Sequence, residues 1–176
     1  MIESVYWKQD LLAHAKQLKQ KKPIRYSEKR QVNFEKELII SFFKIRKLAE
    51  DNKLSDSTIN HKVVISKFNP TGKKITKLNH HAFDELYDMD NEIKTTKGII
   101  FLTNQFIHSV TLFAFQNSDH IWESIFLCSD FDRDKNLYLV TVPEVIKVFE
   151  MVCRNYPRQV SYTWDDKLGD YRSRTE

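Results

Sequence analysis

Apolar residues recur every three or four positions in the first third of the chain, which is the spacing of amphipathic helices. Residues 3–22 fit one such helix, and Pro23 ends it because proline cannot continue a helix. Ser27 is a favourable N-cap for a second, longer helix over residues 27–52. The apolar stripe of that second helix consists of Phe34, Leu38, Phe42, Ile45 and Ala49. The pattern therefore predicts a helical N-terminal third.

Shorter segments follow this helical part. An apolar run rich in β-branched residues predicts a strand over residues 61–68, and the dipeptides Asn-Pro and Thr-Gly predict a turn over residues 69–74. Residues 82–89 fit a short helix. Residues 90–98 are polar, and we expect them to form an exposed loop.

The most apolar window, residues 98–116, is predicted to contain two elements. Treated as a single strand, its first half leaves apolar and polar side chains on both faces. At about 100° per residue, the same half sorts its amide and imidazole side chains onto one arc and most of its aliphatic ones onto the other. We therefore predict a helix over residues 97–108 and a strand over residues 110–116.

The C-terminal half contains two more strand-like runs, residues 120–129 and 136–142. Short turns separate them from each other and from the preceding strand, which predicts an antiparallel meander that the strand over residues 61–68 could join at its edge. Pro143 is suited to the first turn of a last helix, and Pro157 closes it.

The expected fold class is α+β: an antiparallel β-meander with helices packed on one face and a helical N-terminal third. The chain has only four prolines and three glycines, so no flexible linker divides it, and we expect a single domain over residues 1–176. In this domain, residues 1–53 form a helical basic part and residues 59–157 form the sheet with its helices. The polar tail over residues 165–176 is expected to be loose.

Charge is unevenly distributed along the chain. Residues 1–53 carry 13 Lys and Arg against 7 Asp and Glu, whereas the net charge of the whole chain is only +4. This asymmetry is typical of a protein whose basic part meets an acidic partner, and also of a helix surface that is simply rich in solvated lysine. Both interpretations remain open at this point.

The cysteines and the N-terminus favour a cytoplasmic protein. Cys128 and Cys153 lie in apolar surroundings and are interpreted as free buried thiols in a reducing compartment. The opening MIESVYWKQD lacks a charged-then-apolar signal pattern. The apolar window carries amide and imidazole groups that would be costly in hydrocarbon, so we expect no membrane span.

Three alternating aspartates, Asp130, Asp132 and Asp134, resemble the first ligands of a calcium-binding loop. Such a loop needs glycine at its sixth position for a sharp turn and glutamate at its twelfth for bidentate binding. Lys135 and Thr141 occupy those positions, and both flanks are strand-like. We therefore interpret the segment as a hairpin turn and expect no metal there.

Several catalytic motifs are missing. With glycines only at positions 72, 98 and 169, the chain has neither the phosphate-binding pattern GxxxxGK[ST] nor GxGxxG. It also lacks GxSxG, HExxH and CxxC. These absences disfavour most nucleotide-dependent enzymes and zinc hydrolases, and we expect no cofactor.

One candidate ligand site is the polar arc of the helix predicted over residues 97–108. Asn104, Gln105 and His108 lie on this arc, and an imidazole flanked by amides can bind a polar ligand or transfer a proton. His108 is the candidate catalytic residue. The competing interpretation is that the arc is the wet side of an amphipathic helix or a satisfied polar cluster.

A second candidate site is the string RYSEKR, which gathers Arg25, Lys29 and Arg30 around the predicted helix start. A helix start attracts anions through its free N–H groups and its dipole. Lys21 and Lys22 add to the positive charge, and the aromatic side chains Tyr26 and Trp7 are candidates for stacking on bases. The competing interpretation is a basic corner between two helices.

The strings RYSEKR, FEKE, FLTNQFIHS and SDFDRDKNLYLV, in this order, resemble small uncharacterised bacterial proteins. The resemblance covers most of the chain and implies no activity, so it assigns no role to any residue.

These observations favour a non-enzymatic binding or interaction protein, an accessory protein of a bacterial or mobile-element system, with a protein partner or further copies of itself. Two alternatives stay open. One is a nucleic-acid-binding accessory protein that uses the basic N-terminal helices. The other is a small enzyme with a site centred on His108.

Overall fold

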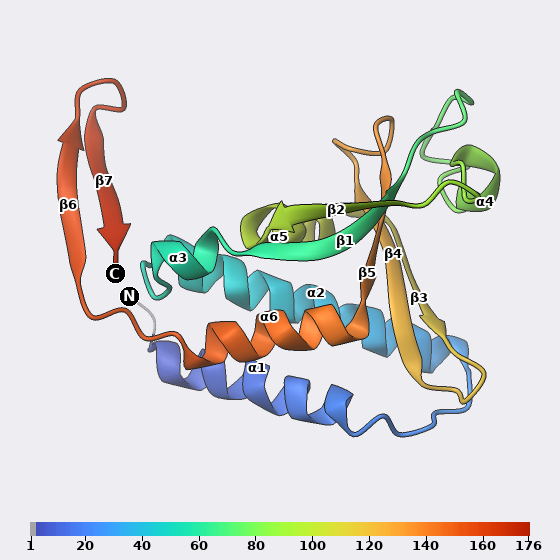
Figure 1. Ribbon diagram of the computed structural model, residues 1–176, viewed down its shortest axis with the longest axis horizontal. Helices are drawn as coiled ribbons and strands as arrows, with labels where there is room; N and C mark the ends of the chain where they lie inside the picture. The colour runs from blue at the N-terminus through green and yellow to red at the C-terminus, as the bar shows by residue number, and fades with distance from the viewer. Residues whose placement is uncertain (1–2) are drawn as a thin grey trace.

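The computed structural model describes residues 3–176 and has a five-stranded antiparallel sheet with the long helices packed against one of its faces (Figure 1). The helices predicted from apolar periodicity are all present, and the Ser27 hydroxyl accepts a hydrogen bond from the Arg30 amide as an N-cap. Pro143 lies in the first turn of the last helix. The helices are α1 (Ser4–Lys19), α2 (Glu28–Glu50), α3 (Asp56–Ile59), α4 (Phe83–Leu86), α5 (Ile99–Ile107) and α6 (Val142–Arg154).

The predicted meander is confirmed, since β3, β4 and β5 are antiparallel neighbours in the sheet order β2-β1-β5-β4-β3. Strand β1 joins the meander by pairing with β5, as expected. The sheet strands are β1 (Lys62–Phe68), β2 (Ile93–Gly98), β3 (Ser109–Gln116), β4 (Trp122–Ser129) and β5 (Leu137–Thr141). Together with the helical N-terminal region, this arrangement confirms the α+β class.

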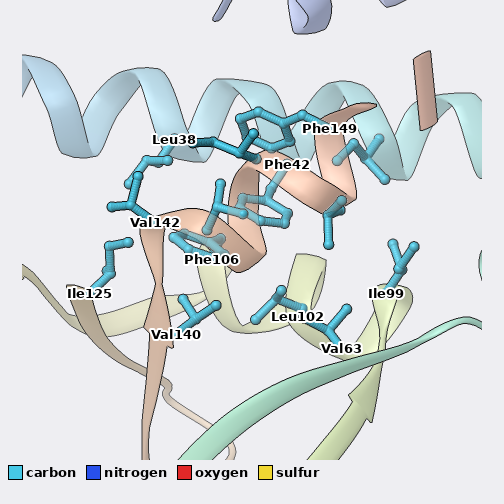
Figure 2. Close-up of a cluster of buried hydrophobic side chains, with 14 of the residues drawn as sticks. Leu38, Phe42, Val63, Ile99, Leu102, Phe106, Ile125, Val140, Val142 and Phe149 are labelled. Carbon is cyan, nitrogen blue, oxygen red and sulfur yellow. The ribbon is translucent and has the colours of Figure 1, made fainter. Parts of the chain in front are cut away.

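The main core lies between the long helices and one face of the sheet. The rings of Phe42 on α2 and Phe106 on α5 stack with centroids 3.9 Å apart, and Phe149 on α6 packs on Phe42 at 5.4 Å (Figure 2). Ile125 and Val140 extend from the sheet into the same cluster and are fully buried. Helix α1 packs outside this layer, against α6 and α2.

The opposite face of the sheet is covered by the segment that holds the short helix α4. Phe83 of α4 packs on Phe126 of β4 with ring centroids 5.5 Å apart, and buried Tyr87 donates its hydroxyl to the Arg133 carbonyl at 2.7 Å. The long helices therefore share one face, as predicted, while α4 belongs to the other.

Two segments differ from the prediction. Residues 90–98 do not form only an exposed loop, because β2 occupies residues 93–98 and pairs with β1 as an edge strand. In place of a loose tail over residues 165–176, strands β6 (Val160–Asp165) and β7 (Asp170–Thr175) form a separate hairpin. Both segments are polar, and polar strands lack the apolar run on which the prediction relied.

Candidate functional site: a basic cavity at the α1–α2 corner

A cavity of about 640 Å³ opens where the end of α1, the start of α2 and the β3–β4 turn meet. Its basic lining comes from the α1–α2 connection and the first turn of α2, while Phe34 and Trp122 contribute apolar surface. These two rings stack with centroids 4.5 Å apart, so they form a rigid wall. The basic side chains that line the cavity are Lys21, Lys22, Arg25 and Arg30.

Hydrogen bonds fix the shape of this corner. The Ile24 amide donates to the His120 carbonyl at 2.9 Å, and the Gln116 side-chain amide donates to the Ile24 carbonyl at 3.0 Å. The Arg30 guanidinium donates to the Arg25 carbonyl at 2.6 Å. The connection between the helices is therefore tied to the sheet on one side and to α2 on the other, so that a ligand would meet a largely preformed basic surface.

None of the four basic side chains forms an ion pair with a carboxylate of residues 3–176. Nearby Lys19, in contrast, pairs with Glu150 at 2.6 Å and does not line the cavity. One carboxylate, that of Glu37, lines the cavity. The cavity is lined by four cationic side chains and only one carboxylate, so the protein itself does not neutralise its positive charge. This excess positive charge is the main chemical property of the site.

The structure separates the residues of the predicted anion site. Arg25 and Arg30 line the cavity, whereas the exposed Lys29 does not. Tyr26 is 57% exposed beside it, but Trp7 packs against the main core. The aromatic wall is instead made by Trp122, which sequence reasoning did not assign because it lies far along the chain, on β4.

The polar arc of α5 has two of its three candidate side chains engaged within the protein. Gln105 is 2% exposed; it donates to Asp132 at 2.5 Å and accepts from the Ser129 amide at 2.8 Å. Asn104 accepts from Arg46 at 2.6 Å. His108 is exposed at the C-terminal end of α5. None of the three lines the basic cavity, and a ligand site centred on His108 stays a prediction.

The aspartate turn is built by ion pairs and hydrogen bonds rather than by a shared ligand position. Asp130 pairs with Arg133 at 2.8 Å, whereas Asp132 contacts Gln105 and Lys135. Among residues 3–176, no three histidine, cysteine or acidic side chains gather as a metal site would require.

The two cysteine thiols are expected to be unreactive. Cys128 and Cys153 are free and buried, as predicted. Burial raises the pKa of Cys128, and it raises the pKa of Cys153 to about 11. Both therefore stay protonated near neutral pH and are poor nucleophiles.

Comparison of the chain with protein-family models, with curated proteins and with solved structures finds no match. Within residues 3–176, no helix combines the length and the apolar character needed to cross a membrane. Functional inference therefore rests on the geometry of the basic cavity.

Proposed function

We propose that this chain is a non-enzymatic binding protein whose basic cavity takes the phosphate groups of a nucleic acid. The observation that carries the proposal is the set of four cationic side chains that line one cavity without a carboxylate partner within residues 3–176. In complexes of proteins with nucleic acids, lysine and arginine side chains neutralise phosphodiester groups and donate hydrogen bonds to their oxygens.

Two further features support a polymer rather than a small anion. The basic surface continues past the cavity at the start of α2, where Lys29 is exposed next to Arg30 of the cavity lining. Tyr26 is exposed in the same segment and offers a ring for stacking on an unpaired base. A backbone of repeating phosphates can use the cavity and the adjoining surface together, whereas a single phosphate cannot.

The test is fluorescence anisotropy with a labelled single strand and a labelled duplex at increasing salt. If all four cations meet phosphates, the slope of log affinity against log salt should be about −3 to −4. The double variant Lys22→Glu, Arg25→Glu should bind at least tenfold more weakly, with a slope shallower by about 2. Neither substitution removes a side-chain hydrogen bond of the fold.

The matched control is Lys62→Glu, Lys77→Glu, which changes net charge equally at exposed positions of β1 and the following loop, outside the cavity. Its affinity should stay within about threefold of the wild type, because separated surface charges are screened by salt. Equal losses in both double variants would mean that only net charge matters. An absence of binding at low salt in the wild type would refute the proposal.

A second prediction separates binding from stability. Lys21 has φ 47°, a left-handed backbone conformation that residues other than glycine adopt at a cost of about 1 kcal/mol. Lys21→Gly should raise the free energy of unfolding by up to about 1 kcal/mol, yet weaken nucleic-acid binding several-fold by removing a cavity cation. Urea denaturation and anisotropy measure the two effects.

The control for this variant is His120→Gly. His120 has φ 58°, its exposed side chain does not line the cavity, and the variant keeps the backbone carbonyl that accepts from the Ile24 amide. The substitution should stabilise the fold in the same way and leave affinity unchanged. Unchanged affinity in Lys21→Gly would exclude Lys21 from the binding surface.

A further inference from the structure

The basic cavity has a buried apolar floor and an exposed charged rim. The floor consists of lining residues that are 9% exposed or less: Phe34, Trp122 and Val142. The cations of the rim, Lys22 and Arg25 among them, are exposed. Phosphate groups gain from the rim but cannot use the floor, because a charged group is costly to remove from water. The floor therefore suits a part of the ligand that carries no charge.

The rim also holds a carboxylate that phosphate binding does not explain. Glu37 lines the cavity with its side chain 48% exposed, and within residues 3–176 it forms no ion pair with lysine or arginine. The His14 Nε2 lies 3.8 Å from it, but burial lowers the pKa of that imidazole to about 4 and keeps it neutral near pH 7. A carboxylate repels phosphate and only accepts hydrogen bonds, so Glu37 suits a donor on the ligand.

An amide lies beside this carboxylate. Asn33 precedes Glu37 by four residues, so the two side chains are neighbours on one face of α2, and both line the cavity. The Asn33 side-chain oxygen accepts from Lys36 at 3.3 Å, while its N–H groups have no acceptor among residues 3–176. The rim therefore offers a carboxylate acceptor next to an amide donor.

We propose, resting on the nucleic-acid binding proposed above, that the cavity holds one unpaired guanine of a single strand, with its ring on the apolar floor and its Watson–Crick edge on Glu37. A base is flat and uncharged, and about 640 Å³ lies within the range of roughly 300–1,000 Å³ for pockets that hold small ligands. The phosphates on either side of this base stay on the cationic rim.

The choice of guanine follows from the hydrogen-bonding groups of the four bases. Guanine presents two adjacent donors, N1–H and the 2-amino group, to a carboxylate, and its O6 can accept from the Asn33 amide. Adenine, cytosine and thymine each place an acceptor beside the donor on the same edge, and a carboxylate repels that acceptor. Pairing in a duplex occupies the edge, so the guanine must be unpaired.

The test is fluorescence anisotropy with labelled eight-nucleotide dT strands whose central nucleotide is dT, dG, dA or dC, a length within the span of about 4–16 nucleotides bound by single-strand-binding domains. The wild type should bind the dG strand at least about fivefold more tightly than the others, which is the discrimination that a bidentate contact to one base provides. Annealing the dG strand to its complement should remove this advantage. A central inosine, which keeps N1–H but lacks the 2-amino group, should bind with intermediate affinity.

The variant Glu37→Gln separates base recognition from phosphate binding. Glutamine has a similar shape but no charge, and it places a donor beside its acceptor, so the preference for dG over dT should fall to within about twofold. The plain dT strand should bind at least as tightly as it does to the wild type, because a negative charge has left the rim. A cavity that bound only phosphates would bind both strands more tightly.

The matched control is Glu28→Gln, which removes an exposed carboxylate from the same helix outside the cavity lining. Its preference for dG should equal that of the wild type, and urea denaturation checks that both variants remain folded. Equal affinity of the wild type for all four strands, inosine bound as tightly as dG, or a dG preference that survives Glu37→Gln would overturn this proposal and leave the phosphate site intact. An absence of binding to every strand at low salt would instead refute the proposed function.

Discussion

Replacing Gln105 with leucine is expected to lower the free energy of unfolding by about 3 kcal/mol or more. Leucine fills a similar volume but leaves the Asp132 carboxylate with only the longer contact to Lys135, at 3.4 Å, and leaves the Ser129 amide without its acceptor. Asp132 is 7% exposed, so water replaces the lost amide poorly. Urea denaturation followed by circular dichroism measures the loss.

The adjacent residue provides the control. Asn104 also bonds a side chain, that of Arg46, but both groups are partly exposed and can turn to solvent. Asn104→Leu should therefore cost less than about 1 kcal/mol. If Gln105→Leu proved as mild as Asn104→Leu, the amide of Gln105 would be dispensable for the fold and available for a ligand, as the sequence pattern first indicated.

The difference between Gln105 and Asn104 shows what a helical pattern can reveal. Periodicity correctly placed both residues on the polar arc of a helix, because side-chain direction follows from local geometry. It could not show that Gln105 points at the β4–β5 turn, since Asp132 reaches it only after the meander has formed. A buried polar network and a ligand site have the same residue types, and only the tertiary partners distinguish them.

The basic corner was predictable in part for the same reason. Arg25 and Arg30 flank an N-cap, and a cap is a local signal. The cavity itself depends on Trp122 and Glu37, which join these residues only through packing between helices and sheet. The hairpin was missed because alternation in SYTWD and DYRSRT joins aromatic rings to polar neighbours without a continuous apolar run.

Stability is also expected to fall as the pH decreases from about 6.5 to about 4, because of His14. This imidazole lies between α1 and α2, with its Nδ1 2.8 Å from the Ser41 hydroxyl and its ring 5.4 Å from that of Phe149. Its Nε2 has no hydrogen-bond partner within the described chain. Burial, and then the positive charge of Lys44, lower the pKa of His14 to about 4.

The direction of the effect follows from this lowered pKa. At a pH between the pKa values of His14 in the folded and the unfolded chain, the imidazole is protonated in the unfolded chain and neutral in the folded one. Lowering the pH therefore favours unfolding. The contribution of His14 is complete above pH 6.5 and is lost by about pH 4, a change of about 3 kcal/mol. Glu37 lies 3.8 Å from Nε2, but its carboxylate is 48% exposed and offsets little of this change.

The measurement is urea denaturation at several pH values for the wild type and for His14→Gln. Glutamine can keep a hydrogen bond to Ser41 and does not titrate, so the difference between the two curves isolates His14 from the carboxylates that protonate in the same range. The variant should lose less stability than the wild type between pH 6.5 and 4, and the two curves should converge or cross. Parallel curves would show that the folded protein accepts a proton on His14 as readily as the unfolded chain does, and would contradict the lowered pKa.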